Sequence, residues 1–335
     1  MGIDIVRVDP LDAAQRSLFA EWRDVLEASE RVEYGDEHSV DALDQYVASY
    51  RNQRYERRAA WAAVADGRVV GHLAVELHLR DNTHRAELTL AVQPEHRRRG
   101  VGTALLETAE RVARDERRTV LGVESDVATG HDDPAAGFAA RRGFGAAQQE
   151  LHSRLTVPVA IESARAEAEK HANEYEVLTS WDGIPDEWLA DRAWLARRMS
   201  TDAPLGAVDF GEEDWSADRV RHDFDLIRQE GRRVVESVAR HVPSGQLVGY
   251  TTIVVTEGRP EIAEQWATLV LHEHRGRRLG LLLKTANLQA LVAEMPLVRR
   301  IHTWNAVENE PMLQVNRSLG FAPVGLMTEW QKRLA

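Results

Sequence analysis

Cysteine, lysine and long apolar runs are scarce or missing in this sequence of 335 residues. The complete lack of cysteine excludes disulfides, thiolate metal ligands and a cysteine nucleophile. Lysine occurs only at Lys170, Lys284 and Lys332, so arginine supplies nearly all of the positive charge. Because no apolar run has the length of a signal peptide or a membrane span, we expect a cytoplasmic protein with no membrane partner. No metal site is predicted.

Length and charge narrow the class of protein further. A chain of this length suggests about two domains, and a hydrophobic fraction of 43% allows each of them a core. The formal net charge is −12, which disfavours binding to nucleic acid or to anionic lipid. We therefore expect a small-molecule substrate rather than a nucleic-acid partner, and a monomer or a homodimer.

The most informative stretch is Leu88–Ala113, which has the pattern of a strand, a basic loop and a helix. Apolar residues alternate with others through Leu88–Val92, as in a short strand. Gly100 and Gly102 then open a segment whose apolar residues follow the spacing of one helix face. A glycine-bearing loop at a helix N-terminus can bind an anion through unpaired N–H groups and the helix dipole, and Arg97–Arg99 add positive charge beside it.

An internal repeat covers the chain. Three segments recur in the same order, with their last residues 177 or 178 positions apart, and they are Gly67–Gly71 with Gly245–Gly249, Leu90–Arg97 with Leu269–Arg275, and Arg142–Phe144 with Leu319–Phe321. Two copies of one fold are the simplest explanation. We predict domains at residues 1–157 and 173–335, joined by a solvated linker helix at 158–172.

The pattern of the first copy also predicts its main elements. We expect a first strand at Ile3–Val8 and a hairpin of two strands that turns at Asp66-Gly67. Further elements follow along the chain, and they are helical segments near Trp22 and at Val40–Tyr50, hairpin strands at Ala59–Ala65 and Val69–Glu76, strands at Ala86–Val92 and Val120–Glu124, a helix at Pro134–Arg142 and a last strand that reaches Val157.

The spacing Arg97-x-x-Gly100-x-Gly102 resembles the pyrophosphate loop of the GNAT N-acetyltransferase superfamily. As a whole, the chain resembles the tandem GNAT proteins of actinobacteria, the group that includes mycothiol synthase. The resemblance implies an α/β fold of two tandem GNAT domains, each with a mixed, mainly antiparallel central sheet flanked by helices. It also implies acetyl-CoA as cosubstrate, a small primary amine as acceptor, and chemistry in the C-terminal domain.

The resemblance places acetyl-CoA on matching residues of both copies. They are Leu90, Ala91, Val92, Arg97, Arg98, Arg99, Gly100, Val101, Gly102 and Thr103 in the first copy, and Leu269, Val270, Leu271, Arg275, Gly276, Arg277, Arg278, Leu279, Gly280, Asn305 and Asn309 in the second. The second loop departs from the pattern, because Arg278 stands where the first loop has Gly100. For the two asparagines, capping of turns or helices is the alternative.

Three glutamates are candidates for the general base. Glu264 lies eleven residues before Arg275, where many members of the superfamily carry a catalytic glutamate. Glu87 lies ten residues before Arg97, one step out of that register, and one step along a strand reverses the face. Glu124, on the next predicted strand, is the substitute in the first copy. For each of them a solvated or salt-bridged glutamate is the alternative.

The resemblance is incomplete at the proton donor for the thiolate. The superfamily usually has a tyrosine four residues before the Gly-Phe pair, but here those positions hold Ala139 and Asn316. The absence of cysteine still favours direct transfer in a ternary complex. The missing tyrosines keep open an alternative, an acyl-CoA-binding regulatory protein with little turnover. A module that binds nucleic acid through the arginine clusters is a further rival, which the net charge disfavours.

Overall fold

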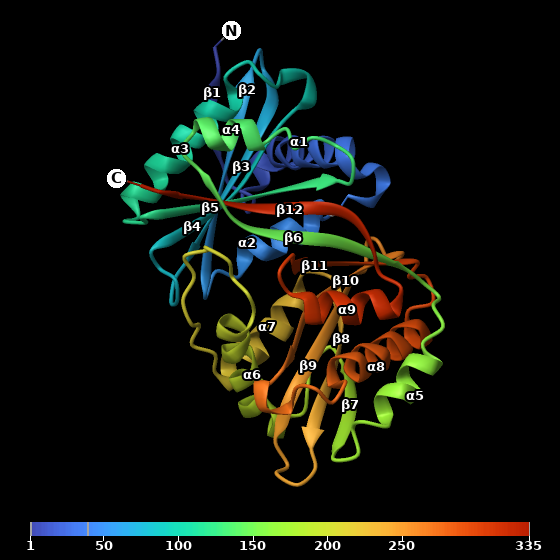
Figure 1. Cartoon of the computed structure of the whole chain (residues 1–335). Helices are drawn as coiled ribbons and strands as arrows, with labels where there is room; N and C mark the ends of the chain where they lie inside the picture. The colour runs from blue at the N-terminus through green and yellow to red at the C-terminus, as the bar shows by residue number, and fades with distance from the viewer. Residues whose placement is uncertain (1, 39, 335) are drawn as a thin grey trace. The chain divides into compact units, whose positions relative to one another are not determined.

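A computed structural model describes residues 2–38 and 40–334 (Figure 1). Met1 and Ala335, which end the two predicted domains, lie outside the described residues. The helices and strands of the N-terminal half are β1 (Asp4–Val8), α1 (Arg16–Tyr34), α2 (Leu43–Arg51), β2 (Glu56–Ala65), β3 (Arg68–His78), β4 (Arg85–Val92), α3 (Val101–Asp115), β5 (Val120–Ala128), α4 (Ala136–Arg141) and β6 (Gly145–Thr156).

The C-terminal half repeats this order after a linking helix. Its elements are α5 (Glu162–Glu169), β7 (Tyr175–Trp181), α6 (Leu189–Asp202), α7 (Ala217–Gln229), β8 (Arg232–His241), β9 (Leu247–Thr256), β10 (Ile262–Val270), α8 (Leu279–Glu294), β11 (Arg300–Ala306), α9 (Glu310–Leu319) and β12 (Ala322–Arg333). No helix within residues 2–38 and 40–334 is long and apolar enough to cross a bilayer.

Two compact units divide the chain. The first unit runs to Gln149 and also contains Gly206–Asp209 and the residues from Leu326 onward. The second unit contains Glu150–Leu205 and Phe210–Gly325. This division differs from the predicted one, because the last strand of each half ends in the unit of the other half.

The first unit is a mixed sheet with the strand order β1-β2-β3-β4-β5-β12. Strands β1 to β4 pair in antiparallel fashion, and β4 pairs with β5 in parallel. The predicted hairpin is confirmed, since Asp66 and Gly67 join β2 to β3 with positive φ angles of 50° and 75°. Helices α1 and α2 cover one face around Trp22 and Phe19, and α3 covers the other around Leu105.

The second unit repeats this sheet with the order β6-β11-β10-β9-β8-β7. Among the described residues of this unit, β10 and β11 pair in parallel, and the other neighbouring strands in this order are antiparallel. Helices α6 and α7 cover one face, and α8 covers the other. Both sheets are mixed and mainly antiparallel, so the predicted fold class is confirmed.

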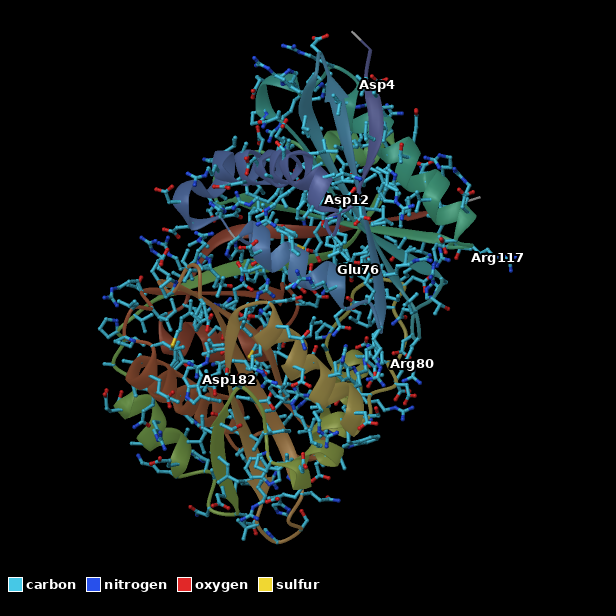
Figure 2. All side chains as sticks on the ribbon, turned by 180° about the vertical axis from the view of Figure 1, so that it is seen from behind. Asp4, Asp12, Glu76, Arg80, Arg117 and Asp182 are labelled. Atoms are coloured by element: carbon cyan, nitrogen blue, oxygen red, sulfur yellow. The ribbon has the colours of Figure 1, made fainter. Side chains whose placement is uncertain are left out.

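The linker helix differs from its prediction in one respect. We expected a solvated helix at residues 158–172, and α5 forms there, but Ala168 and Ala172 are buried in the core of the second unit. The small side chain of Ala168 lets α5 pack closely against α8, so one face of α5 is buried. At the far edge of the same sheet, Asp182 (Figure 2) closes the end of β7 by accepting hydrogen bonds from the Val234 N–H at 3.0 Å and from Arg233 Nε at 2.6 Å.

Candidate active site

The two parallel strands of the first unit, β4 and β5, separate halfway along their length. Pairing joins Arg85–Leu88 of β4 to Val120–Val123 of β5, and among the described residues it ends there. Strand β4 continues to Val92 and β5 to Ala128. The predicted residues Leu90, Ala91 and Val92 lie on the parted stretch. Backbone N–H groups on such an edge can donate to the carbonyl oxygen of a thioester.

The second unit parts at the corresponding place. Pairing joins Ile262–Glu264 of β10 to Arg300–His302 of β11, and within the described part of the chain it goes no further. The predicted residues Leu269 and Val270 lie beyond the parting point on β10, while Leu271 follows the end of the strand. The sheets of both units therefore open toward a loop and a helix N-terminus.

The two phosphate loops have the same backbone path with glycine and arginine exchanged. In the first loop, Arg98 and Gly100 have positive φ angles of 62° and 90°. In the second, Gly276 and Arg278 have positive φ angles of 80° and 54° at the positions 178 residues later. Arg278, where the second loop departs from the pattern, adopts the left-handed conformation of Gly100, at a cost of roughly 1 kcal/mol.

Helices α3 and α8 begin in the same way after these loops. The first helical hydrogen bond runs from Ala104 N–H to Gly100 O at 3.1 Å and from Leu282 N–H to Arg278 O at 3.0 Å. The three N–H groups before each donor lack an acceptor within the helix, so they can serve an anion. They belong to the predicted residues Val101, Gly102, Thr103, Leu279 and Gly280, and to Leu281.

The first arginine of each loop anchors the loop to the strand before it. Arg97 Nε donates to Val92 O at 3.3 Å, and Arg275 Nε donates to Val270 O at 3.0 Å. This repeated contact turns the backbone toward the helix. These arginines thus hold the backbone of the loop. The helix N–H groups and the neighbouring residues Arg99 and Arg277 are the groups that can offset the negative charge of a phosphate.

Glu87 and Glu264 occupy the same place in their sheets. Glu87 lies opposite Glu76 of β3, and Glu264 lies opposite Val254 of β9, which is 178 residues after Glu76. From the sequence we expected Glu87 to be one step out of register. That expectation is wrong, because the pairing of β10 with β9 shifts by one residue between Gln265 and Thr268, and this bulge contains the extra residue.

The surroundings of Glu87 bind its carboxylate. Arg85 Nε donates to Glu87 Oε1 at 2.7 Å, and Arg85 Nη2 donates to Glu329 Oε1 at 2.8 Å. Burial lowers the pKa of Arg85, but the carboxylates of Glu87 and Glu329 more than offset this and raise it. A Cβ atom at Gly122 would lie within 3 Å of the Glu87 carboxylate, so Glu87 lies over that glycine.

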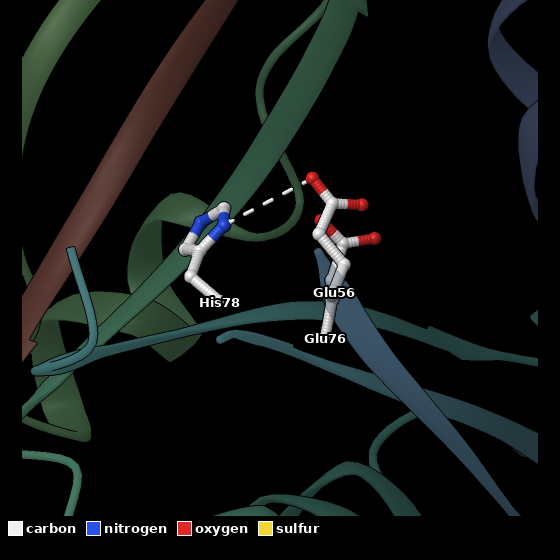
Figure 3. A group of neighbouring side chains, drawn as sticks. All are labelled: Glu56, Glu76 and His78. Carbon is white, nitrogen blue, oxygen red and sulfur yellow. Dashed lines mark ion pairs between the residues drawn. The ribbon is translucent and has the colours of Figure 1, made fainter. Parts of the chain in front are cut away.

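A charged cluster continues from Glu87 across the sheet. Glu56, Glu76 and His78 place ligand-type atoms within 4.8 Å of one another, and His78 lies 3.9 Å from Glu56 (Figure 3). Arg58 donates to Glu76 at 2.7 Å and to Glu56 at 2.9 Å. The guanidinium therefore neutralises the carboxylates that a cation would need.

Glu264 has different neighbours. Its Oε2 accepts a hydrogen bond from Trp266 Nε1 at 2.9 Å, and the Trp266 side chain is exposed. Across the last parallel pair lies His302, a residue that the sequence did not single out. The third candidate, Glu124, lies in an exposed position two residues beyond Gly122 on the same face of β5.

Of the two predicted asparagines, Asn305 contacts Asn316 and Asn309 does not. Asn316 Nδ2 donates to Asn305 Oδ1 at 2.6 Å, and Asn316 Oδ1 is buried and accepts no hydrogen bond from the described residues. A buried acceptor of this kind suits an amide N–H, such as those of a pantetheine arm. Asn309 caps α9 by accepting from Met312 N–H at 3.4 Å, which is the capping role named as its alternative.

Comparisons with known proteins agree with this geometry. Residues 19–144 match the model of the acetyltransferase (GNAT) family. The chain is 28% identical to a solved tandem GNAT protein from the clavulanic acid biosynthesis pathway, with 99% of this chain and 98% of that chain covered and a TM-score of 0.79. A GCN5-related N-acetyltransferase from Sphaerobacter thermophilus shares the fold at 16% identity, with 99% and 95% covered and a TM-score of 0.68.

No protein with a curated description matches the chain by sequence. Enzymes of the GNAT family generally use acetyl-CoA, and they bind an acyl-CoA together with a small substrate. Both units have the parted strands and the loop at a helix N-terminus that such a cosubstrate needs. Residues 19–144 thus match the GNAT acetyltransferase family, and the chain as a whole has the fold of a tandem GNAT acyltransferase.

Proposed function

We propose that this protein transfers an acetyl group from acetyl-CoA to a small primary amine, and that the second unit performs the transfer. One observation carries the proposal. Glu264 lies at the point where β10 and β11 part, and its carboxylate is held by Trp266 at an exposed position. A carboxylate placed there can accept the proton of an amine that approaches the parted strands.

Direct transfer in a ternary complex suits this chain, because no cysteine is present to carry the acyl group. Acetyl-CoA supplies the activated thioester. The amine nitrogen forms a bond to the carbonyl carbon, the bond from that carbon to sulfur breaks, and the thiolate takes up a proton. The residues of the chain orient the thioester along the strand edge, stabilise its carbonyl oxygen with backbone N–H groups, and accept the amine proton at Glu264.

The first unit is the weaker candidate for this chemistry. Its equivalent carboxylate, Glu87, is bound by Arg85, and Arg85 is itself buried. The missing tyrosine does not separate the two units, because its position holds Ala139 in the first and Asn316 in the second. The ion pair of Glu87 with Arg85 favours a second role for the first unit, in which it binds acyl-CoA with little turnover. If both units lack turnover, the whole chain is the acyl-CoA-binding regulatory protein.

The decisive experiment compares two matched variants. Glu264→Gln keeps the shape of the side chain and removes its basicity, so we expect the rate of CoA release across a panel of primary amines to fall on the order of a hundredfold. Affinity for acetyl-CoA, measured by calorimetry, should stay unchanged. Glu87→Gln is the control and should keep most of the activity. Loss of activity in Glu87→Gln with full activity in Glu264→Gln would assign the chemistry to the first unit.

A further inference from the structure

A buried pair of histidines lies beside Glu264 in the second unit. His152 Nε2 and His302 Nδ1 are 2.8 Å apart, and the two side chains are 3% and 4% exposed. Trp304 stacks on His152 with ring centroids 4.4 Å apart and an angle of 22° between the planes. The pair therefore has a fixed geometry and little contact with bulk water.

The register of the sheet places this pair next to the candidate base. His302 lies directly opposite Glu264 in the last parallel pair before the strands part, so their backbones are about 4.8 Å apart. Paired residues on neighbouring strands extend to the same face. His152 lies on the other neighbour of β11, diagonal to His302. The order along the sheet is thus His152, His302 and Glu264.

This order determines how the ring of His302 can be used. Its Nδ1 is the nitrogen that contacts His152 of β6, so its Nε2 is the nitrogen that lies outside this contact. When His302 is neutral and donates from Nδ1, its Nε2 has a lone pair. When His302 takes up a proton at Nε2, the bond to His152 persists, because Nδ1 still donates.

The duplicated unit provides an internal comparison. In the first unit, the residue opposite Glu87 is Gly122, and no histidine stands there. The carboxylate of Glu87 is bound by Arg85, whereas Ile262 occupies the position of Arg85 in the second unit. The two units thus differ at the residue that lies opposite the carboxylate. The histidine near Glu87 comes instead from β3, where His78 Nε2 lies 3.9 Å from Glu87 Oε1.

We infer that His302, oriented by His152, receives the amine proton from Glu264 and so restores the basicity of that carboxylate. The inference rests on the proposed function of Glu264. The proton moves from the amine nitrogen to the Glu264 carboxylate and then to His302 Nε2, and no other bond changes. His302 acts through Glu264 and is a positioning residue. Charged groups on the same face include Arg300 of β11, Arg154 and Glu150 of β6, and Glu236 of β8.

Two variants of His152 separate this role from simple packing. His152→Gln can still accept a hydrogen bond near the place of Nε2, whereas His152→Phe keeps the ring stacked on Trp304 and removes the acceptor. We expect His152→Gln to retain turnover within about threefold and His152→Phe to lose on the order of a hundredfold. A pair that only fills space would show the opposite order.

His302→Asn completes the set, because its side chain can keep the contact with His152 but has no basic nitrogen. It should lower the rate of CoA release as His152→Phe does, with unchanged affinity for acetyl-CoA and unchanged Tm. Ser153→Ala, a change at a buried residue on the same strand as His152, is the matched control and should leave turnover unchanged. Full activity of His302→Asn alongside loss in Glu264→Gln would overturn the inference and leave the proposed function standing.

A measurement without any amine tests the same point. Long-range 1H–15N spectra of the full chain report which nitrogen of each imidazole carries the proton, and the His302 signals are those that vanish in His302→Asn. We expect His302 to be protonated at Nδ1 and bare at Nε2. A resting His302 protonated at Nε2 would overturn the inference, because that nitrogen could not accept a proton from Glu264.

Discussion

Single residues decide whether the two loops can hold a phosphate. Gly100 and Arg278 share the left-handed conformation at the start of α3 and α8, so a side chain at this position is compatible with the loop. The nearest atom to a Cβ built on Gly100 is Ile3 Cδ1 at 4.0 Å, which leaves space for one. The charge of the side chain, rather than its bulk, should then govern binding of the anion.

Two substitutions of Gly100 should therefore have different outcomes. Gly100→Asp should abolish acetyl-CoA binding by the first unit, because it sets a negative charge against the phosphates. Gly100→Arg copies Arg278 and should retain binding, at a conformational cost of roughly 1 kcal/mol in stability. Calorimetric titration of both variants gives the stoichiometry and affinity. Equal loss of binding in both would show that bulk is the cause.

Lys284 is a second residue with a measurable consequence. It is 1% exposed on α8, its Nζ lies 5.7 Å from the ring centroid of Phe321, and burial lowers its pKa to about 7. The corresponding residue of the first unit, 178 positions earlier, is the buried Leu106. An apolar side chain is therefore already accommodated at this place in one copy of the fold.

We predict that Lys284→Met stabilises the second unit at pH 7. The pKa of the lysine is lower in the folded chain than its ordinary value of 10.5, so the unfolded chain binds more protons between pH 7 and pH 10.5. The wild type should thus gain stability as the pH rises through this window. The advantage of the variant, on the order of a few kcal/mol at pH 7, should shrink toward pH 10. Thermal denaturation at several pH values measures this, with the exposed Lys170→Met as control.

At the level of elements, close packing explains why glycine recurs at positions 71 and 249. A Cβ at Gly71 of β3 would lie 2.8 Å from Leu105 and 2.9 Å from Val101, both on α3. A Cβ at Gly249 of β9 would lie 2.8 Å from Leu269 O and 3.3 Å from Leu283 of α8. The repeated segments Gly67–Gly71 and Gly245–Gly249 each end on one of these glycines. The missing side chain allows α3 and α8 to lie close to their sheets.

Substitution of these glycines should therefore be costly. We expect Gly71→Ala to destabilise the first unit by about 1–3 kcal/mol, the usual effect of overpacking. Gly249→Ala should cost at least as much, because the nearest atom belongs to the backbone and cannot rotate away. Gly258→Ala, with no atom within 4 Å of its Cβ, is the control. Urea denaturation of the three variants would contradict the prediction if all midpoints coincided.

The sequence predicted those elements whose pattern is local. The hairpin at Asp66-Gly67 and the strand, loop and helix from Leu88 to Ala113 follow from alternation and helical spacing within short windows. The bulge in β10 could not be predicted, because it is defined by the partner strand and not by the sequence of β10 itself. The match of Glu87 with Glu264 therefore appeared only in the pairing of the strands.

Contacts between distant residues were also beyond the reach of the sequence. Arg85 reaches Glu329, which lies 244 residues later, and no local pattern marks either residue as the partner of the other. His302 and His152 are 150 residues apart and carry no motif. The sequence thus identified the two loops at the helix N-termini, but not the side chains that surround each carboxylate.

At the level of the whole molecule, each unit depends on chain from the other half. The last residues of β12 supply Glu329 to Arg85, and Lys332 to Glu110 at 2.6 Å. Residues 150–156 of β6 pair with β11 in the second unit. Neither half of the sequence contains all the strands of one unit.

Truncation tests this dependence. Removal of residues 326–335 should destabilise the first unit, since Arg85 would stay buried without Glu329 and Gln331. Glu87 would remain as a partner of Arg85, and loss of the second carboxylate from this buried charge should cost on the order of a few kcal/mol. Hydrogen exchange should show faster exchange in β4 and β5, with β8 and β9 of the second unit unaffected as an internal control. Unchanged protection of β4 in the shortened chain would refute the prediction.

The place of β12 also affects how the protein is made. Translation delivers the first unit's N-terminal strands long before Leu326, yet that unit is completed only by residues near the end of the chain. The second unit has all of its residues by Gly325. The part of the molecule that is synthesised first is therefore finished last, and a chain cut short anywhere before Leu326 leaves the ribosome with its N-terminal sheet incomplete.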